Sequence, residues 1–208
     1  HGANLGGYGR KEIHESFLKS FEIISSRNDV TQESFELYES TPINWQDGKE
    51  FELPNLDSKV EYKNLFLEDK TSFRGRMIGG CIDVLKNIIG TSLDNTKKFC
   101  RQFEEGVIWY LENCEMSLCD LYRALWQMRE AGWFENANGF LFGRTMRKNT
   151  INDFTYEDVL HDALNCLNVP VIYDVDFGHT QLQWTIINGS SGKFEYEQGR
   201  GKLEMKFL

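Results

Sequence analysis

A histidine and a glutamate each follow a stretch that is typical of a buried β-strand. His179 comes after residues 170–175, which are rich in β-branched and aromatic side chains, and Gly178 directly before it allows the backbone to turn sharply. Glu112 ends the apolar run 106–111. The carboxyl ends of parallel strands meet at one edge of a sheet, where ligand and catalytic groups gather. We therefore expect Glu112 and His179 to lie within hydrogen-bond distance of each other.

A carboxylate beside an imidazole is the base half of a nucleophilic triad. The carboxylate accepts the Nδ1–H of the imidazole, fixes its tautomer and stabilises the imidazolium, so that Nε2 can take a proton from a hydroxyl. A histidine that only caps a strand is an equal alternative for the stretch around His179 taken alone.

The sequence shows no matching nucleophile. None of the serines lies in a Gly-x-Ser-x-Gly elbow between a strand and a helix. Ser190 and Ser191 lie in a predicted hairpin turn, and Ser117 is a predicted helix N-cap. Cys114, two residues after Glu112, is expected to point elsewhere and to be inert. The sequence thus predicts a base and its orienting carboxylate without a group for them to activate.

Two further stretches are candidates for ligand contacts. Gly79 and Gly80 follow a strand predicted to end at residues 77–78, and glycines before a helix can bring backbone N–H groups close to an anion. The pattern is not a full phosphate-loop motif, so close packing is the favoured interpretation. Trp45 lies in the turn-rich loop 41–48, where we expect an exposed ring that could stack on a ligand. Packing of Trp45 against its own loop is an equal alternative.

Composition excludes several classes of function. The chain has 208 residues, enough for one good core or two small ones, and a net charge of −9. This charge argues against a nucleic-acid partner, because such proteins concentrate Lys and Arg. There is no apolar run of about 18 residues that would predict a membrane-spanning helix. The N-terminus has no signal-peptide pattern.

The cysteines and histidines indicate a reduced protein without a metal. The five cysteines are an odd number and include no Cys-x-x-Cys pair, so a cytoplasmic protein is a simpler interpretation than a disulfide scaffold. The four histidines are scattered, and no His/Cys cluster has the spacing of a zinc site. We expect no metal and no other cofactor.

Strand and helix patterns alternate along the chain and predict an α/β fold with a mainly parallel sheet and an antiparallel C-terminal tail. An amphipathic helix is predicted over residues 8–24, with Ile13, Phe17, Phe21 and Ile24 on its apolar face. The other predicted elements are strands over 34–38, 73–78, 106–111, 139–143 and 170–175, helices over 82–89, 118–128 and 155–164, and tail strands over 182–187, 193–196 and 202–207.

Five short segments follow one another across nearly the whole chain. They are HGANL at 1–5, GRMIGG at 75–80, IWYLEN at 108–113, AGWF at 131–134 with Gly139, and FGHT at 177–180. In kind and order they resemble the LD-carboxypeptidases, which are serine peptidases of the S66 type. This family includes murein tetrapeptide carboxypeptidases and the microcin C self-immunity peptidases.

The resemblance implies a Ser-Glu-His triad in which Glu112 and His179 are the catalytic glutamate and histidine. The family serine lies in an N-terminal domain, upstream of the segment that matches residues 1–5. The complete enzyme would hydrolyse an amide bond of an LD-linked muropeptide or of a microcin C-type aminoacyl-nucleotide through an acyl-enzyme. His179 would act as general base and then as general acid. Trp45 and Thr180 are the residues assigned to substrate binding.

Three positions depart from the family pattern: Ala3, Cys81 and Asn113 replace a proline, an asparagine and an aspartate. None of them removes a member of the triad. The loop around Trp45 and the stretch 173–177 resemble the microcin-immunity branch.

The resemblance also implies a swivelling β/β/α domain and a division of the chain. Residues 1–26 would be the end of the N-terminal domain, 27–70 a linker with the tryptophan loop, and 71–208 the C-terminal domain. Because the chain starts at His1 and not at a methionine, we interpret it as a piece of a longer polypeptide. Its expected partners are the substrate, the N-terminal domain and a second copy in a homodimer, but no nucleic acid and no membrane. The alternative is a non-enzymatic binding or regulatory module in which Glu112 and His179 are only structural.

Overall fold

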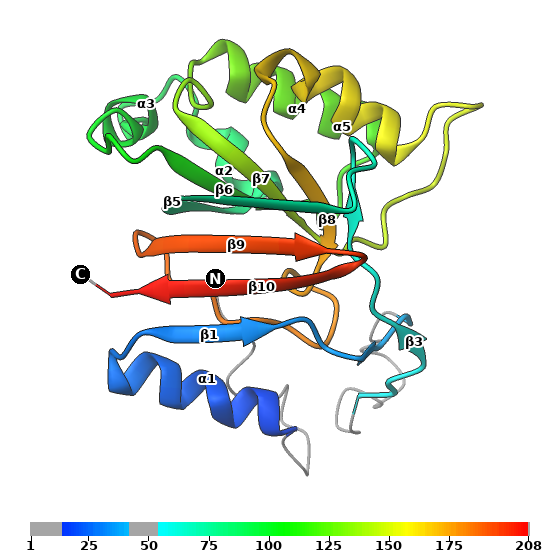
Figure 1. Ribbon diagram of the computed structural model, residues 1–208. Helices are drawn as coiled ribbons and strands as arrows, with labels where there is room; N and C mark the ends of the chain where they lie inside the picture. Colours follow the sequence, from blue (N-terminus) through cyan, green and yellow to red (C-terminus); the bar gives the residue numbers. More distant parts are fainter. Residues whose placement is uncertain (1–13, 42–53, 208) are drawn as a thin grey trace.

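A computed structural model describes residues 14–41 and 54–207 and contains one eight-stranded mixed sheet (Figure 1). Across the sheet the strands are β1 (Val30–Glu33), β10 (Arg200–Lys206), β9 (Ser191–Glu197), β5 (Lys70–Cys81), β6 (Val107–Glu112), β7 (Ala137–Gly143), β8 (Val171–Val175) and β4 (Lys63–Asn64). A separate pair is formed by β2 (Leu37–Tyr38) and β3 (Ser58–Lys59). The helices are α1 (Glu15–Ser26), α2 (Ile82–Leu85), η3 (Lys86–Ile88), α3 (Thr96–Cys100), α4 (Leu118–Glu130), α5 (Tyr156–Leu164) and η4 (Asn165–Leu167).

The four central strands of the sheet run parallel. Strand β5 pairs with β6, β6 with β7, and β7 with β8, all in parallel register. Strands β9, β10 and β1 on one side and β4 on the other side are antiparallel. The predicted α/β class, with a parallel centre and an antiparallel C-terminal tail, is confirmed. The carboxyl ends of β6, β7 and β8 consequently lie at the same edge.

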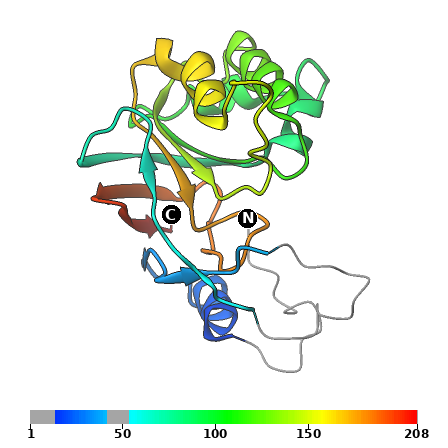
Figure 2. The ribbon, with the colours of Figure 1, turned by 90° about the vertical axis from the view of Figure 1, so that its right-hand side faces the viewer.

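Helices α4 and α5 cover one face of the parallel strands (Figures 1 and 2). Each helix begins at a capping side chain, because Ser117 accepts from the N–H of Asp120, and Thr155 forms a capping box with Asp158. The apolar stripes of the helices pack on alternate strand residues such as Trp109. The helices predicted over 118–128 and 155–164 and the N-cap predicted at Ser117 are confirmed.

A second core lies on the opposite face of the sheet and includes Trp184 and Ile186 from the segment 182–187. The prediction of a strand for this segment is wrong. Its backbone is bound by a side chain, since the amide of Gln32 donates to Thr185 O at 2.8 Å and accepts from Thr185 N at 3.0 Å. Trp184 and Ile186 are almost fully buried. The apolar residues of this segment therefore reflect insertion into the core and not pairing in a sheet.

Strand β5 continues through the glycine pair. The prediction that this strand ends at residues 77–78 is wrong, because β5 stays paired with β6 as far as Cys81, which lies beside Glu112. The backbone of Gly79 approaches Tyr110 so closely that no side chain would fit there. The glycines thus allow two strands to pack closely, which is the role that the sequence favours for them.

Helix α1 buries a different face from the predicted one. Phe17 is buried as expected, whereas Phe21 and Ile24 are 48% and 46% exposed. The buried side instead includes Ser20, whose hydroxyl accepts from Thr185 Oγ1 at 2.7 Å. This small polar residue lets the helix approach the segment 182–187. The buried face of α1 is therefore rotated by part of a helical turn from the predicted apolar face, and the prediction is wrong. Ile13 lies outside the described residues.

The stretch between α1 and β5 contributes to the main sheet. Strand β1 pairs with β10, and β4 pairs with β8. The strand expected over 34–38 is displaced, because β1 ends at Glu33 and β2 covers only Leu37–Tyr38. The predicted domain limits at residues 26 and 70 remain predictions.

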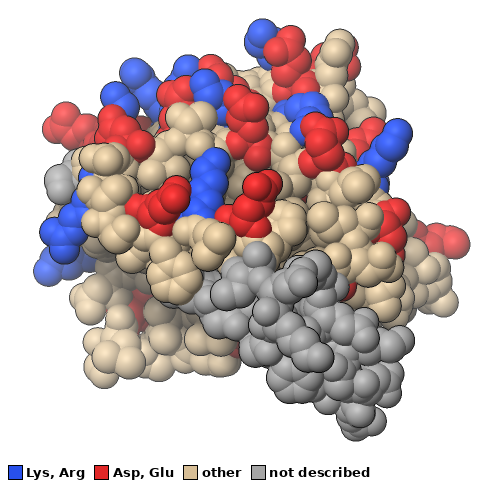
Figure 3. All heavy atoms as spheres, turned by 90° about the horizontal axis from the view of Figure 1, so that it is seen from below, with Lys and Arg blue, Asp and Glu red and all other residues tan. Residues whose placement is uncertain are grey.

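Charged side chains of both signs are interspersed on the face of the molecule seen in Figure 3. The net charge of −9 is therefore not gathered into one acidic area on that face. In the part of the chain that the structure describes, no helix is long and apolar enough to cross a membrane. All five cysteines are free thiols.

Candidate active site

Glu112 and His179 meet at the carboxyl edge of the parallel strands. Nδ1 of His179 lies 3.0 Å from Oε2 of Glu112, so the predicted contact between the two side chains is present. Glu112 is the last residue of β6, and its side chain is 1% exposed, whereas that of His179 is 55% exposed. The pair thus joins a buried carboxylate to an imidazole at the surface.

The chain reaches Glu112 from β8 by crossing the end of β7, which lies between β6 and β8. The crossing takes place over Gly143, the last residue of β7. A Cβ atom at this position would lie 2.9 Å from Cδ2 of Phe177 and closer still to the carbonyl oxygen of Phe177. Only a residue without a side chain leaves room for the loop to pass. Gly143 is therefore part of what brings His179 to Glu112.

Gly178 shapes the contact between the two side chains. Its φ angle is +111°, a conformation that L-residues with a side chain rarely adopt. A Cβ atom there would lie 3.3 Å from Cδ of Glu112 and would collide with Oε2. Both the backbone conformation and the available space require glycine immediately before His179.

The surroundings of His179 favour its protonated form. The hydrogen bond to Glu112 raises the pKa of His179 above its ordinary value of 6.5, and this effect outweighs the opposing effect of burial. The charges of Glu112, Asp83 and Glu115 act in the same direction. An imidazole in this position is well placed to hold a proton taken from a nucleophile.

A pocket of about 440 Å³ opens beside the pair and is lined by the loops that follow β6, β7 and β8. Two of its lining side chains have buried polar atoms without a hydrogen-bond partner in the described part of the chain. They are both amide atoms of Gln181 and Nη1 of Arg144. Buried polar groups are normally satisfied, so these atoms are candidates to bind a molecule in the pocket.

The hydroxyls of Thr145 and Thr180 and the thiol of Cys114 do not replace the expected serine. Among the described residues, no serine lines the pocket. The hydroxyl of Thr145 donates to Asn113 O at 2.7 Å, and that of Thr180 donates to Arg144 O at 3.3 Å. Burial, with nearby carboxylates, raises the pKa of Cys114 to about 11, so little thiolate is present at neutral pH. Thr145, Thr180 and Cys114 are therefore not ready nucleophiles.

The other residues singled out in the sequence fall around this pocket or beyond the described chain. Thr180 lines the pocket and is almost fully buried, and its part in substrate binding remains a prediction. Trp45 lies outside the described residues. The side chain of Asn113 bonds both the N–H and the carbonyl of Met116, which shapes the loop after Glu112.

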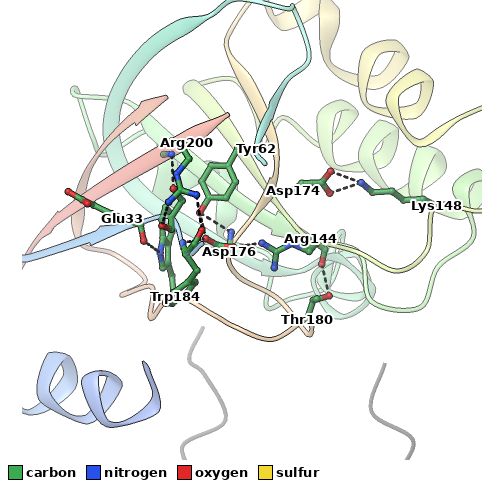
Figure 4. Close-up of polar contacts among 12 residues, drawn as sticks. Glu33, Tyr62, Arg144, Lys148, Asp174, Asp176, Thr180, Trp184 and Arg200 are labelled. Atoms are coloured by element: carbon green, nitrogen blue, oxygen red, sulfur yellow. Dashed lines mark hydrogen bonds and ion pairs between the residues drawn. The ribbon is translucent and has the colours of Figure 1, made fainter. Parts of the chain in front are cut away.

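Sequence reasoning missed a buried polar network at the base of the His179 loop (Figure 4). Asp176 is completely buried and forms an ion pair with Arg144. It also accepts from Tyr62 Oη at 2.6 Å and from the N–H of Phe35 at 2.8 Å. Desolvation raises the pKa of Asp176 against the opposing effect of Arg144. The only signal in the sequence is an aspartate at the end of an apolar strand, which does not reveal its partners.

A family model described as the LD-carboxypeptidase C-terminal domain matches residues 74–194, more than half of the chain. The chain belongs to the LD-carboxypeptidase family. Both Glu112 and His179 lie inside the matched range of this LD-carboxypeptidase domain. The family assignment made from the short segments is confirmed.

Curated and solved relatives are longer than this LD-carboxypeptidase chain. A predicted carboxypeptidase of Vibrio cholerae is 23% identical over 198 residues, which are 94% of this chain and 56% of that protein. The chain therefore spans about half the length of this relative.

Two solved structures share the fold of this LD-carboxypeptidase chain. The muramoyltetrapeptide carboxypeptidase of Oxalobacter formigenes has a TM-score of 0.67 at 17% identity, with 96% of this chain and 57% of that chain covered. An MccF-like protein of Streptococcus pneumoniae, in complex with AMP, has a TM-score of 0.70 at 19% identity, with 95% and 59% covered. At these identities the likeness establishes the fold alone.

Proposed function

We propose that this chain supplies the glutamate and the histidine of a Ser-Glu-His triad in a carboxypeptidase that hydrolyses an amide bond. The single observation that carries the proposal is the 3.0 Å contact between His179 Nδ1 and Glu112 Oε2, with the carboxylate buried and the imidazole beside a pocket. Membership of the LD-carboxypeptidase family supports it.

In the proposed mechanism, Glu112 accepts the Nδ1–H of His179 and so leaves Nε2 as the basic atom. Nε2 takes the proton of a serine hydroxyl while the serine oxygen attacks the carbonyl carbon of the substrate. The imidazolium then gives this proton to the leaving amine, and an acyl-enzyme remains. A water molecule, deprotonated by His179, hydrolyses the acyl-enzyme and restores the serine.

The nucleophilic serine belongs, in this proposal, to a part of the protein outside these 208 residues. Three findings support this placement. The matching model describes a C-terminal domain, and the Vibrio cholerae relative is nearly twice as long as the matched region. In addition, no serine lines the pocket within the described part of the chain.

The relatives suggest two classes of substrate. One solved relative is a muramoyltetrapeptide carboxypeptidase, and another is an MccF-like protein in complex with AMP. We therefore propose an LD-linked muropeptide or an aminoacyl-nucleotide as substrate, with Trp45 as a stacking residue for the second class. Both substrates contain an amide or amide-like acyl bond that a serine triad can cleave.

The test compares amide hydrolysis by the 208-residue chain with hydrolysis by the polypeptide of the complete reading frame. Each is assayed with an LD-linked muropeptide and with an aminoacyl-sulfamoyl adenylate. The longer polypeptide should cleave at least one substrate, and the 208-residue chain neither, because loss of the nucleophile costs roughly 10⁴- to 10⁶-fold in turnover.

Two variants of the longer polypeptide assign the roles. His179→Ala should abolish turnover, and Glu112→Gln should reduce it sharply while the fold is retained. His161→Ala is the matched control, since His161 is exposed and lies on α5, away from the pocket lining. Full activity of His179→Ala, or cleavage by the 208-residue chain at the rate of the longer polypeptide, would refute the proposal.

A further inference from the structure

A second hollow adjoins the catalytic pocket. Its volume is about 320 Å³, and it shares three lining residues with the pocket that contains Glu112 and His179. The shared residues are Arg144, Thr145 and Met146. The hollow is completed by Tyr38, Lys59, Glu61, Lys63, Lys148 and Asp174. We refer to these nine residues as the cationic pocket.

The cationic pocket carries an excess of positive charge in an acidic protein. Four cationic side chains and two carboxylates line it, although the whole chain has a net charge of −9. Lys59, Glu61 and Lys63 are exposed and alternate with the buried Val60 and Tyr62, so the three charged side chains lie on one side of an extended stretch. Among the described residues, neither lysine of this stretch forms an ion pair.

The inner wall of the cationic pocket is held in place by two ion pairs (Figure 4). Lys148 Nζ lies 2.5 and 2.7 Å from the two carboxylate oxygens of Asp174, and Arg144 Nη2 pairs with Asp176. Arg144 is 5% exposed, and its guanidinium carbon lies 3.9 Å from the centre of the Tyr38 ring. The guanidinium is therefore fixed on the boundary between the two pockets.

One atom of this wall is unsatisfied. Nη1 of Arg144 is buried and has no hydrogen-bond partner in the described part of the chain. A buried guanidinium N–H without a partner is costly, and an anionic oxygen is the partner that it binds best. This unsatisfied donor and the two lysines, which form no ion pair with a described residue, point to the same kind of ligand.

We propose that the cationic pocket binds an anionic group, a carboxylate or a phosphate, of a molecule that extends into the catalytic pocket. Arg144 donates from Nη1, and Lys59 and Lys63 supply charge at the rim. The placement of the substrate's scissile bond at His179 rests on the proposed function, whereas the binding of the anion does not. A substrate anchored by its anion in the cationic pocket would extend into the catalytic pocket, because the two share Arg144, Thr145 and Met146.

The test is a titration of the 208-residue chain that is monitored by NMR, with inorganic phosphate as the ligand in one arm and N-acetyl-D-alanine in the other. The ionic strength is kept constant, because salt screens such contacts. Lys59→Glu with Lys63→Glu should weaken binding by more than about tenfold, since two attractive charges are replaced by two repulsive ones. Glu61→Gln should strengthen binding, because it removes the opposing charge. Lys98→Glu with Lys206→Glu is the control for net charge, since both lysines are exposed and lie outside the pocket.

Binding of either anion that the rim variant weakens and the control variant does not would support the proposal. The anion that binds more tightly identifies the source, phosphate for a nucleotide and carboxylate for a peptide. No binding of either anion, or equal weakening by both double variants, would overturn it. These outcomes do not involve catalysis, so they are independent of the effect of His179→Ala on hydrolysis.

Discussion

Gly178 is the position at which a single added methyl group should disturb the Glu112–His179 pair. Alanine at a φ of +111° costs about 1–3 kcal/mol in backbone strain. The new Cβ would also lie 3.3 Å from Cδ of Glu112 and would collide with Oε2, which adds about 1–3 kcal/mol of overpacking. The free energy of unfolding should therefore fall by about 2–6 kcal/mol in Gly178→Ala.

Gly189→Ala is the matched control for this prediction. Gly189 has a φ of +85°, so alanine there carries similar backbone strain, but nothing lies within 4 Å of the position of its Cβ. The difference between the two variants isolates the collision with the carboxylate. Urea unfolding followed by tryptophan fluorescence gives the two free energies, and NMR titration gives the pKa of His179.

We expect Gly178→Ala to be less stable than Gly189→Ala by about 1–3 kcal/mol. The pKa of His179 should also fall in Gly178→Ala, because the carboxylate that raises it is pushed away. Equal stability of the two variants, with the pKa of His179 unchanged in both, would show that Glu112 is not packed against the Gly178–His179 backbone.

Three further predictions follow from the same structure. Asp176→Asn should lower the free energy of unfolding by about 3–5 kcal/mol, because it leaves the charge of Arg144 buried without its partner. The control is Glu195→Gln, at a half-exposed position that pairs with Lys193 on the surface. A loss in urea unfolding no larger than that of this control would contradict the prediction. Thiol labelling at pH 8 should modify Cys166 first, because it is exposed, whereas burial raises the pKa of Cys81 to about 12 and leaves little reactive thiolate there. Cys166→Ser should therefore remove the fastest phase of labelling. The stabilising effect of charged His179 should be present below pH 6.5 and be lost as the pH rises through its raised pKa. Glu112→Gln should therefore flatten this part of the profile of unfolding free energy against pH, measured by urea unfolding. An unchanged profile would show that Glu112 does not stabilise the charged form of His179.

The contact between Glu112 and His179 could be predicted because it depends on a rule about strand ends. Both residues follow apolar strands, and parallel strands end at one edge of a sheet. The same rule does not give the order of the strands. It therefore could not show that β7 lies between them or that the loop crosses over Gly143.

The parts that could not be predicted depend on contacts between residues far apart in the chain. Residues 182–187 read as a strand because their apolar residues are typical of one, but the side chain of Gln32 takes the place of the neighbouring strand. The network around Asp176 joins Phe35, Tyr62 and Arg144 from three separate segments. No local pattern in any of these segments indicates its partners.

The tautomer of His179 decides whether this side chain can act as a general base. A general base needs its proton on Nδ1, donated to Glu112, so that Nε2 is free to accept. Nitrogen-15 NMR of the 208-residue chain, above the pKa of His179, distinguishes the two ring nitrogens, with Glu112→Gln as the comparison. We predict protonated Nδ1 and unprotonated Nε2 in the unmodified chain, and a lower pKa of His179 in Glu112→Gln. A proton on Nε2 in the unmodified chain, or the same pKa in both proteins, would contradict the assignment of Glu112 and His179 as the base half of a catalytic triad.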